Sequence, residues 1–375
     1  MKLAMDLHAA LAPEIAAGVP GLVALVARGG KAEVVALGVR EKGGAAVEPD
    51  SIFRVASMTK PVTAVATMRL VDDGVLQLDA PSERWLPELA DRRVLRRIDA
   101  ELDDVVPARR PITVRDVLSF TWGFGIPMVK PGTYPIQRAI DRLQLCNGMP
   151  MPSKYAPPDE WMRQLGMLPL MHQPGERWMY NSGSDVLGVL VARAAKKSFP
   201  EFLHERIFEP LGMRDTSFVA PAARFTAQYV GDTVYDPIDG EWTKPPPFPS
   251  GAAGLTSTVH DFHMLGAMLL AGGGKVLSSA SVAQLHTDQL TPAQRDAAND
   301  FAGYFTDNTW GFGVGIVTGK DPSGSPGTFG WDGGTGSTWR CDPAEGAIRI
   351  LLSNRAMTSP KPPSLFEAFW RAARA

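Results

Sequence analysis

Strand-like segments occupy the two ends of this chain, and their distribution is the strongest constraint on its fold. Apolar runs at 21–26 and 32–37 flank Gly29-Gly30 and predict a hairpin. Similar runs return at the other end, at 312–317, 338–341 and 348–352, separated by Gly, Pro and Asp. We therefore expect an α/β (α+β) fold, in which one sheet is assembled from both termini and a helical region is inserted.

The middle of the chain is predicted to be mostly helical and rich in loops. Thr113 with Asp116 is an N-cap signature. Helices are expected at 114–120, 185–196 and 262–270, and a final one from about residue 364. Seven prolines between 127 and 158 predict long surface loops. The expected units are a sheet domain of 1–75 with 305–375 and a helical domain of 76–304, with the active site between them.

Composition excludes several classes of function. The chain has 375 residues, of which 45% are hydrophobic and 21% charged, with a formal net charge of -2. These values are ordinary for a soluble globular protein and give no reason to expect a nucleic-acid partner or an anionic membrane. No Cys/His cluster has zinc spacing, so neither a metal nor another cofactor is expected. The bonding of Cys146 and Cys341 stays open, and two free thiols in a reducing compartment are the simpler interpretation.

The N-terminal segment predicts a helix and no targeting signal. Apolar side chains recur at every fourth position from Leu3 to Ile15, which is typical of an amphipathic helix. Asp6 and His8 interrupt the apolar stretch that a secretory signal needs. No window is long and apolar enough to span a bilayer. We therefore expect a cytoplasmic protein, and its oligomeric state is left open.

The segment Ser57-Met58-Thr59-Lys60 is the first candidate for chemistry. An apolar stripe predicts a helix from Ser57 to Val71, and Pro61 is compatible with it only within the first turn. Residues three apart share one helix face, so the Lys60 amine can reach the Ser57 hydroxyl. A buried lysine can then accept the serine proton. Alone, this motif is better explained by a capping serine and a surface lysine, but its place after a strand and next to Pro61 favours the catalytic interpretation.

Two further motifs are candidates for the site, one because of its polar side chains and the other because its glycines leave the backbone accessible. Tyr180-Asn181-Ser182 precedes the helix at 185–196 and can place a phenol at a pocket wall, where a nearby lysine cation would ease its deprotonation. The segment Gly330-Trp331-Asp332-Gly333-Gly334-Thr335-Gly336 has four glycines, which let a ligand approach backbone N–H groups that could hold an oxyanion. A packing tyrosine and a tight turn remain the alternatives for each motif taken alone.

In this order and at these separations, the three motifs resemble the serine β-lactamase and penicillin-binding-protein superfamily. The similarity is greatest to the class C β-lactamase-like group with its Y-x-N middle motif, and to the family VIII carboxylesterases within it. Further segments that match it are 112–118, 174–176, 207–213, 254–258 and 310–313. The resemblance covers nearly the whole chain and implies a β-lactamase/transpeptidase-like fold, in which helices flank an antiparallel sheet and a large helical domain is inserted.

The resemblance also implies roles for individual residues. Ser57 would form the acyl-enzyme with Lys60 as its partner, and Tyr180 would be the general base or proton shuttle. The backbone N–H groups of Ser57 and Gly334 would form the oxyanion hole beside Gly333. Two positions depart from the pattern. Ser182 stands where Asn is frequent, beside Asn181, and Trp331 replaces the lysine that engages a β-lactam carboxylate.

These residues predict a serine carboxylesterase that acts on small or short-chain esters. An ionised Asp332 next to Trp331 would repel an anionic substrate. Candidates for an apolar pocket are Trp122, Phe124, Trp310 and Trp331, and each except Trp331, which adjoins the proposed oxyanion loop, could equally pack in the core. Alternatives are β-lactamase or D-amino acid peptidase or amidase activity, acyl transfer from the same acyl-enzyme, and a non-enzymatic penicillin-binding module. No G-x-S-x-G occurs, which argues against a Ser-His-Asp hydrolase, and His172, His260 and His263 are taken as structural.

Overall fold

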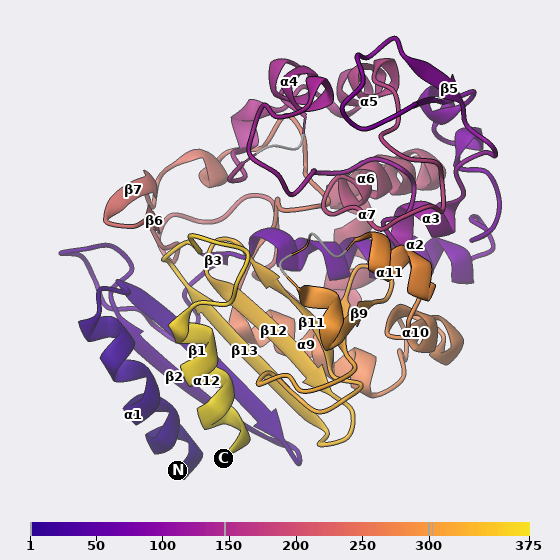
Figure 1. Ribbon diagram of the computed structural model, residues 1–375. Coiled ribbons are helices and arrows are strands. Elements are labelled where there is room, and N and C mark those ends of the chain that lie inside the picture. The colour runs from indigo at the N-terminus through magenta and orange to yellow at the C-terminus, as the bar shows by residue number, and fades with distance from the viewer. Residues whose placement is uncertain (1, 146–147, 299–300, 302) are drawn as a thin grey trace.

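Strands from both ends of the chain form a seven-stranded antiparallel sheet with the order β2-β1-β13-β12-β11-β10-β9 (Figure 1). The computed structural model describes residues 2–145, 148–298, 301 and 303–375. The strands of the sheet are β1 (Gly21–Arg28), β2 (Lys31–Gly38), β9 (Asn308–Trp310), β10 (Gly315–Val317), β11 (Phe329–Gly333), β12 (Ser337–Asp342) and β13 (Ala347–Ser353). The predicted fold class and the sheet shared by both termini are confirmed.

Pairing of β1 with β13 joins the two ends of the chain. The register runs from Leu22 opposite Ser353 to Arg28 opposite Ala347. Alternate residues of β1 enter different cores: Leu22, Ala24 and Val26 on one face, Val23 and Leu25 on the other. Because both faces are covered, these strands are apolar throughout rather than alternating.

Helices cover both faces of the sheet. On one face, α1 (Lys2–Ala16) packs against α12 (Ser364–Arg374), and the two bury Leu11, Phe366 and Trp370 against β1 and β13 (Figure 1). On the other face, α9 (Val259–Leu270) contacts β1, β12 and β13. In the part of the chain described here, no helix is long and apolar enough to cross a membrane.

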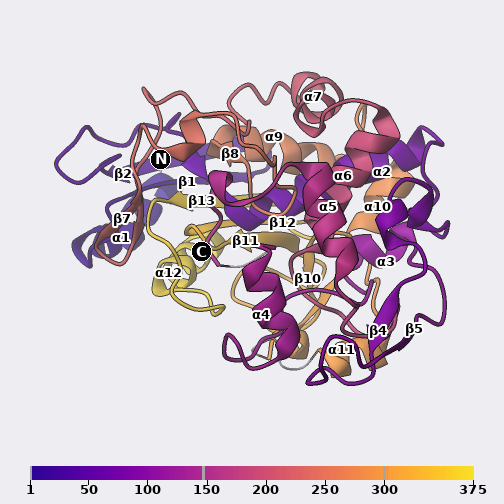
Figure 2. The same cartoon turned by 90° about the horizontal axis from the view of Figure 1, so that it is seen from above.

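The inserted region is built around α2 (Thr59–Asp72) and α6 (Gly183–Ala195), which pack against each other (Figure 2). The remaining helices are α3 (Val114–Leu118), α4 (Pro135–Arg142), α5 (Pro158–Met167), α7 (Phe199–Leu203), α8 (Glu209–Leu211), α10 (Ser279–Leu285) and α11 (Pro292–Ala297). Short strand pairs are β3 (Phe53–Arg54) with β8 (Thr256–Ser257), β4 (Arg93–Leu95) with β5 (Val105–Pro107), and β6 (Gln228–Val230) with β7 (Thr233–Asp236). The predicted boundaries of a sheet domain (1–75 with 305–375) and a helical domain (76–304) remain a proposal.

Several local predictions can be compared with the structure. The cap of α3 is confirmed, because the Thr113 hydroxyl accepts from the Asp116 N–H and the Asp116 carboxylate accepts from the Thr113 N–H. The proline-rich segment is not all loop: α4 lies within it and begins at Pro135, whose missing N–H costs nothing in a first turn. Cys341 is a buried free cysteine of β12, and Cys146 lies outside the described residues.

The prediction of one continuous strand over residues 312–317 was wrong. The chain instead turns between β9 and β10, where the Gly311 N–H donates to the Val314 carbonyl. Gly313 has a φ of 69°, and a side chain there would press on Ala64 and on the Lys60 carbonyl. The turn is therefore shaped by its close approach to the first turns of α2, a tertiary contact that local sequence patterns do not report.

Truncation of the sheet core should cost much more stability than truncation of its edge. Ile350 is fully buried between Leu25 and Trp339, and we expect Ile350→Ala to lower the free energy of unfolding by about 2–5 kcal/mol. Val34 of β2 is 38% exposed opposite the same Leu25, so Val34→Ala should cost less than about 1 kcal/mol. Urea unfolding of both variants measures this difference, and equal losses would contradict the proposed packing.

Candidate active site

The turn that carries Ser57 lies between β3 and α2. Ser57 is the middle residue of the 3₁₀ turn Ala56–Met58. Ala56 has a φ of 42°, in the left-handed region that residues with a Cβ seldom adopt. The Val55 carbonyl before it accepts hydrogen bonds from the Met58 N–H at 3.0 Å and the Ser337 hydroxyl at 3.2 Å. Contacts from the sheet therefore hold a strained turn in place, a feature common at functional sites.

The glycine-rich segment at the end of β11 packs directly on this turn. Gly333 has no room for a side chain, because a Cβ would collide with the Val55 carbonyl and the Ser337 hydroxyl. Gly334 differs, since a Cβ there would meet nothing within 4 Å and the residue lines the main pocket. Its carbonyl accepts from the Met357 N–H at 2.9 Å. Gly333 thus provides close packing, while Gly334 faces the pocket beside Ser57.

Lys60 is buried in the first turn of α2, one turn after Ser57. Its Nζ lies 2.8 Å from Ser57 Oγ, and it donates to the Ala252 carbonyl at 2.8 Å. The side chain has no exposed surface. Burial in a medium of low dielectric favours the neutral amine over the ammonium. The spacing of three residues therefore places a nitrogen base against a hydroxyl group, as the chemistry of an activated serine requires.

Tyr180 lies just before α6 and touches both partners. Its hydroxyl is hydrogen-bonded to Ser57 and accepts from Trp331 Nε1–H at 2.7 Å, and Lys60 Nζ lies 4.7 Å from the centre of its ring. Burial raises the pKa of Tyr180 to about 12, outweighing the hydrogen bonds that lower it. The expected easing of deprotonation was wrong, because removal from water penalises the phenolate more than its neighbours stabilise it.

Trp331 belongs to an aromatic cluster that surrounds Tyr180. Its ring meets Trp310 edge-on at 4.6 Å and Tyr304 at 5.5 Å. Other members are Phe120, Trp178, Phe301 and Phe305. Apart from Trp310 and Trp331, sequence reasoning missed these residues. They are scattered from 120 to 331, and no local pattern links them.

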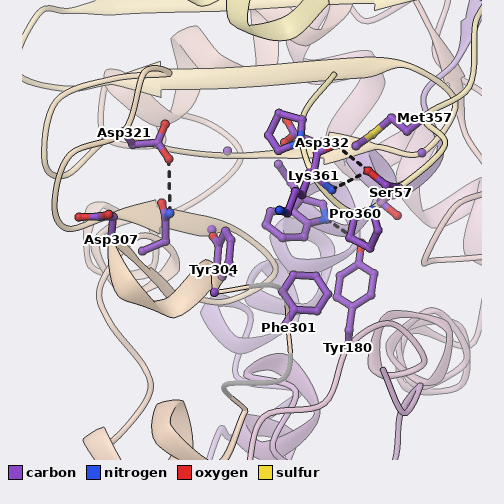
Figure 3. Close-up of a pocket in the computed structure, with 18 of the residues that line it drawn as sticks. Ser57, Tyr180, Phe301, Tyr304, Asp307, Asp321, Asp332, Met357, Pro360 and Lys361 are labelled. Atoms are coloured by element: carbon purple, nitrogen blue, oxygen red, sulfur yellow. Dashed lines mark hydrogen bonds between the residues drawn. The ribbon is translucent and has the colours of Figure 1, made fainter. Parts of the chain in front are cut away.

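A pocket of about 680 Å³ opens at Ser57. Figure 3 shows Ser57 and Met357 at one end and Asp307 and Asp321 at the other, with Phe301 and Tyr304 between them. Charged residues line both ends, because Lys361 lies near Ser57 while Asp307 and Asp321 lie far from it. Lining residues that sequence analysis did not anticipate include Met128, Met149, Phe301, Tyr304, Lys320, Asp321, Arg340 and the segment 357–362.

The charge expected on Asp332 is neutralised. Arg340 donates to both of its carboxylate oxygens, at 2.8 and 3.0 Å. The pair is mostly buried and lines the pocket. Bidentate pairing of this kind commits both charges to each other. The Arg340 guanidinium therefore offsets the negative charge that Asp332 was expected to present to an anionic substrate.

Five residues predicted for the site or its pocket do not line the pocket wall, and one of them, Trp310, is a fully buried member of the aromatic cluster. Trp122 and Phe124 are 0% and 1% exposed and pack in the main core, where their rings lie tilted against each other with centroids 5.5 Å apart. Ser182 is buried at the start of α6, where its hydroxyl donates to the Phe124 carbonyl at 3.5 Å. Asn181 has a φ of 94° and makes the turn into that helix. The structure assigns these residues to packing and backbone geometry.

Comparisons with known proteins identify the family. The Beta-lactamase family model matches residues 7–372. Esterase EstB of Burkholderia gladioli is 31% identical, covering 90% of this chain and 86% of EstB. The lovastatin esterase of Penicillium rubens is 32% identical, covering 81% of this chain and 80% of that protein. The solved structure of EstCE1, a hydrolase with promiscuous acyltransferase activity, superposes with a TM-score of 0.80 at 24% identity, covering 98% of each chain. The chain therefore belongs to the beta-lactamase family of serine hydrolases.

The hydrogen bond from Trp331 to Tyr180 gives a direct test of the site. Trp331→Phe keeps an aromatic ring and removes the N–H donor, so we expect kcat for ester hydrolysis to fall by about 10- to 100-fold. Trp310→Phe is the matched control, since the indole N–H of Trp310 has no hydrogen-bond partner among the described residues. Steady-state assays compare the two. Equal losses of kcat in the two variants would show that the effect comes from packing in the aromatic cluster rather than from the hydrogen bond to Tyr180.

Proposed function

We propose that this member of the beta-lactamase family is a serine carboxylesterase that forms its acyl-enzyme on Ser57. The observation that carries the proposal is the contact of one hydroxyl group with two partners, the buried Lys60 amine and the Tyr180 phenol at the pocket wall. The esterase relatives EstB and lovastatin esterase support ester chemistry. An open backbone position at Gly334, next to Ser57 in the pocket, supports an oxyanion site formed by their two N–H groups.

Acylation begins with proton transfer from Ser57. The neutral Lys60 amine donates an N–H to the Ala252 carbonyl, which leaves its lone pair for the serine proton. Ser57 Oγ attacks the ester carbonyl, and the oxyanion forms at the N–H groups of Ser57 and Gly334. The leaving alkoxide takes the proton of Tyr180, whose raised pKa keeps it a phenol in the free enzyme. The products of this half-reaction are the acyl-enzyme, an ammonium on Lys60 and a phenolate on Tyr180.

Deacylation returns both protons. Water gives a proton to the Tyr180 phenolate and attacks the acyl carbon, and the Lys60 ammonium reprotonates Ser57 as the acid leaves. Trp331 Nε1–H is a donor only, so it stabilises the phenolate between the two half-reactions. Each residue thus ends the cycle in the protonation state in which it began.

The pocket supports a short acyl group joined to a larger alcohol part. Pockets of about 300–1,000 Å³ hold drug-sized ligands, and this pocket is about 680 Å³. A short-chain ester would fill only the end of the pocket near Ser57. The same volume leaves room for an acceptor alcohol, which favours acyl transfer as a second candidate. Product analysis with an added alcohol separates the two, because transfer diverts the acyl group from acid to a new ester.

The identity of the nucleophile is tested by substitution and labelling. Ser57→Ala should lower kcat by several orders of magnitude, and Lys60→Ala by nearly as much, because the two act as a unit. A p-nitrophenyl alkylphosphonate should add one phosphonyl group to the wild-type chain at Ser57, as seen by intact-mass and peptide mass spectrometry. A folded Ser57→Ala variant that keeps most of its activity, or label on another residue, would sink the assignment.

We expect ester hydrolysis to exceed β-lactam hydrolysis. The Trp331 ring carries no charge, its N–H is bonded to Tyr180, and the nearby Arg340 is held by Asp332, so neither Trp331 nor Arg340 supplies a free cation for a lactam carboxylate. Lys320 and Lys361 also line the pocket, but neither stands at the motif position that Trp331 occupies. The kcat/KM for p-nitrophenyl butyrate should exceed that for nitrocefin by at least about a hundredfold, or roughly 2.7 kcal/mol. Trp331→Lys should shift the ratio toward nitrocefin. Similar efficiencies in the wild type would defeat this expectation.

A further inference from the structure

A buried carboxylate on α6 lies behind the catalytic lysine. Asp185 is only 5% exposed, and its Oδ1 accepts from the Ser250 hydroxyl at 2.6 Å and from the Ala252 N–H at 3.1 Å. The carbonyl of the same Ala252 accepts from Lys60 at 2.8 Å. One residue therefore bridges the acid and the amine.

The segment that forms this bridge is fixed between two helices. The Thr63 hydroxyl of α2 donates to the Gly251 carbonyl at 2.7 Å. A side chain at Gly251 would collide with the Ser184 carbonyl of α6. The Ala252 carbonyl consequently has little freedom to move away from Lys60.

Charge also couples the two groups. Burial raises the pKa of Asp185, while its hydrogen bonds and the charge of Lys60 act in the opposite direction. The groups that face Lys60 are Ser57 from the 3₁₀ turn, Tyr180 from the loop before α6, and Asp185 from α6 itself. Only the last of these three can be an anion in the free enzyme near neutral pH, because Ser57 is a hydroxyl and Tyr180 is kept a phenol.

We propose that Asp185 is a positioning residue for Lys60, orienting its amine through Ala252 and stabilising, in its ionised form, the ammonium that develops as Ser57 is deprotonated. This inference rests on the proposed function, because it assigns Asp185 a part in the same acylation step. A carboxylate that orients a base and stabilises its protonated form serves the same purpose behind the histidine of a Ser-His-Asp triad. Here the orientation runs through a backbone residue instead of a direct hydrogen bond.

Asp185→Asn tests the charge while keeping an oxygen that can accept both hydrogen bonds. Loss of the anion makes the Lys60 ammonium easier to deprotonate, so the acid limb of the pH–rate profile should move to lower pH by about one unit or more. The weaker base should also lower the plateau by at least about tenfold. The readout is the second-order rate constant for phosphonylation of Ser57 by a p-nitrophenyl alkylphosphonate, measured across pH.

Asp261→Asn is the matched control. Asp261 of α9 is likewise a buried carboxylate that accepts from a hydroxyl, that of Thr216 at 2.7 Å, and from a backbone N–H, that of Asp215 at 2.8 Å. It does not line the pocket. Its substitution should leave both the limb and the plateau at their wild-type positions, which separates a specific effect from the general cost of altering a buried acid.

Ser250→Ala gives a second, milder test. It removes one donor to Asp185 and keeps the charge. We expect a smaller fall of the plateau with no shift of the limb, and a plateau at the wild-type value would overturn positioning through Ala252. If the wild type is labelled at Ser57 but the acid limb of Asp185→Asn does not shift, the proposed role of the Asp185 charge is wrong and the proposed function is unaffected. Failure of the wild type to be labelled at Ser57 overturns the proposed function as well.

Discussion

The contact between the glycine-rich end of β11 and the turn before α2 holds the site together. It is possible only because Gly333 lacks a side chain, so that the strand can press on the Val55 carbonyl. One side of this contact contributes Trp331 and Gly334 from the sheet. The other side contributes Ser57 and Lys60 from the beginning of α2. A close backbone approach thus sets the distance between groups that belong to different parts of the fold.

Burial gives the site its chemistry. Lys60 and Asp185 are removed from water and Tyr180 is partly buried at the pocket wall, and each would be unfavourable if its polar atoms lacked partners. Their hydrogen bonds form one connected set from Trp331 through Tyr180 and Ser57 to Lys60, and through Ala252 to Asp185. In a low dielectric such interactions are stronger than in water, and a change in one protonation state affects the others.

Much of the fold could be predicted from sequence, because its signals are local or repeat with regular spacing. The apolar runs at both ends gave β1, β2, β12 and β13, and Pro61 restricted where α2 could begin. Spacing placed Lys60 against Ser57, and the order of three motifs indicated the family. Predictions failed, or missed a partner, where long-range contacts decide. Examples are the turn at Gly313, shaped by α2, and the pairing of Asp332 with Arg340 across two strands.

The pocket was the least predictable part. Aromatic residues such as Trp122 are common in cores, and nothing local distinguishes them from Phe301 or Tyr304, which do line the pocket. Asp185 was equally hidden, because in sequence it is an ordinary polar residue in the first turn of a helix. Its partners Ser250 and Ala252 lie about 65 residues further along the chain.

Trp331 links substrate preference with proton transfer in this site. A lysine there would offer a cation both to a substrate carboxylate and to a phenolate. The indole offers a neutral donor, and in this structure that donor is directed to Tyr180. A neutral donor stabilises a phenolate less than a cation does, so burial prevails and the pKa of Tyr180 rises to about 12. Such a phenol is a weak acid, yet an alkoxide is a stronger base than a phenolate and can still take its proton. Trp331, a neutral donor in place of a lysine, therefore also leaves Tyr180 a phenol, the form that the proposed mechanism needs for protonating the leaving alkoxide.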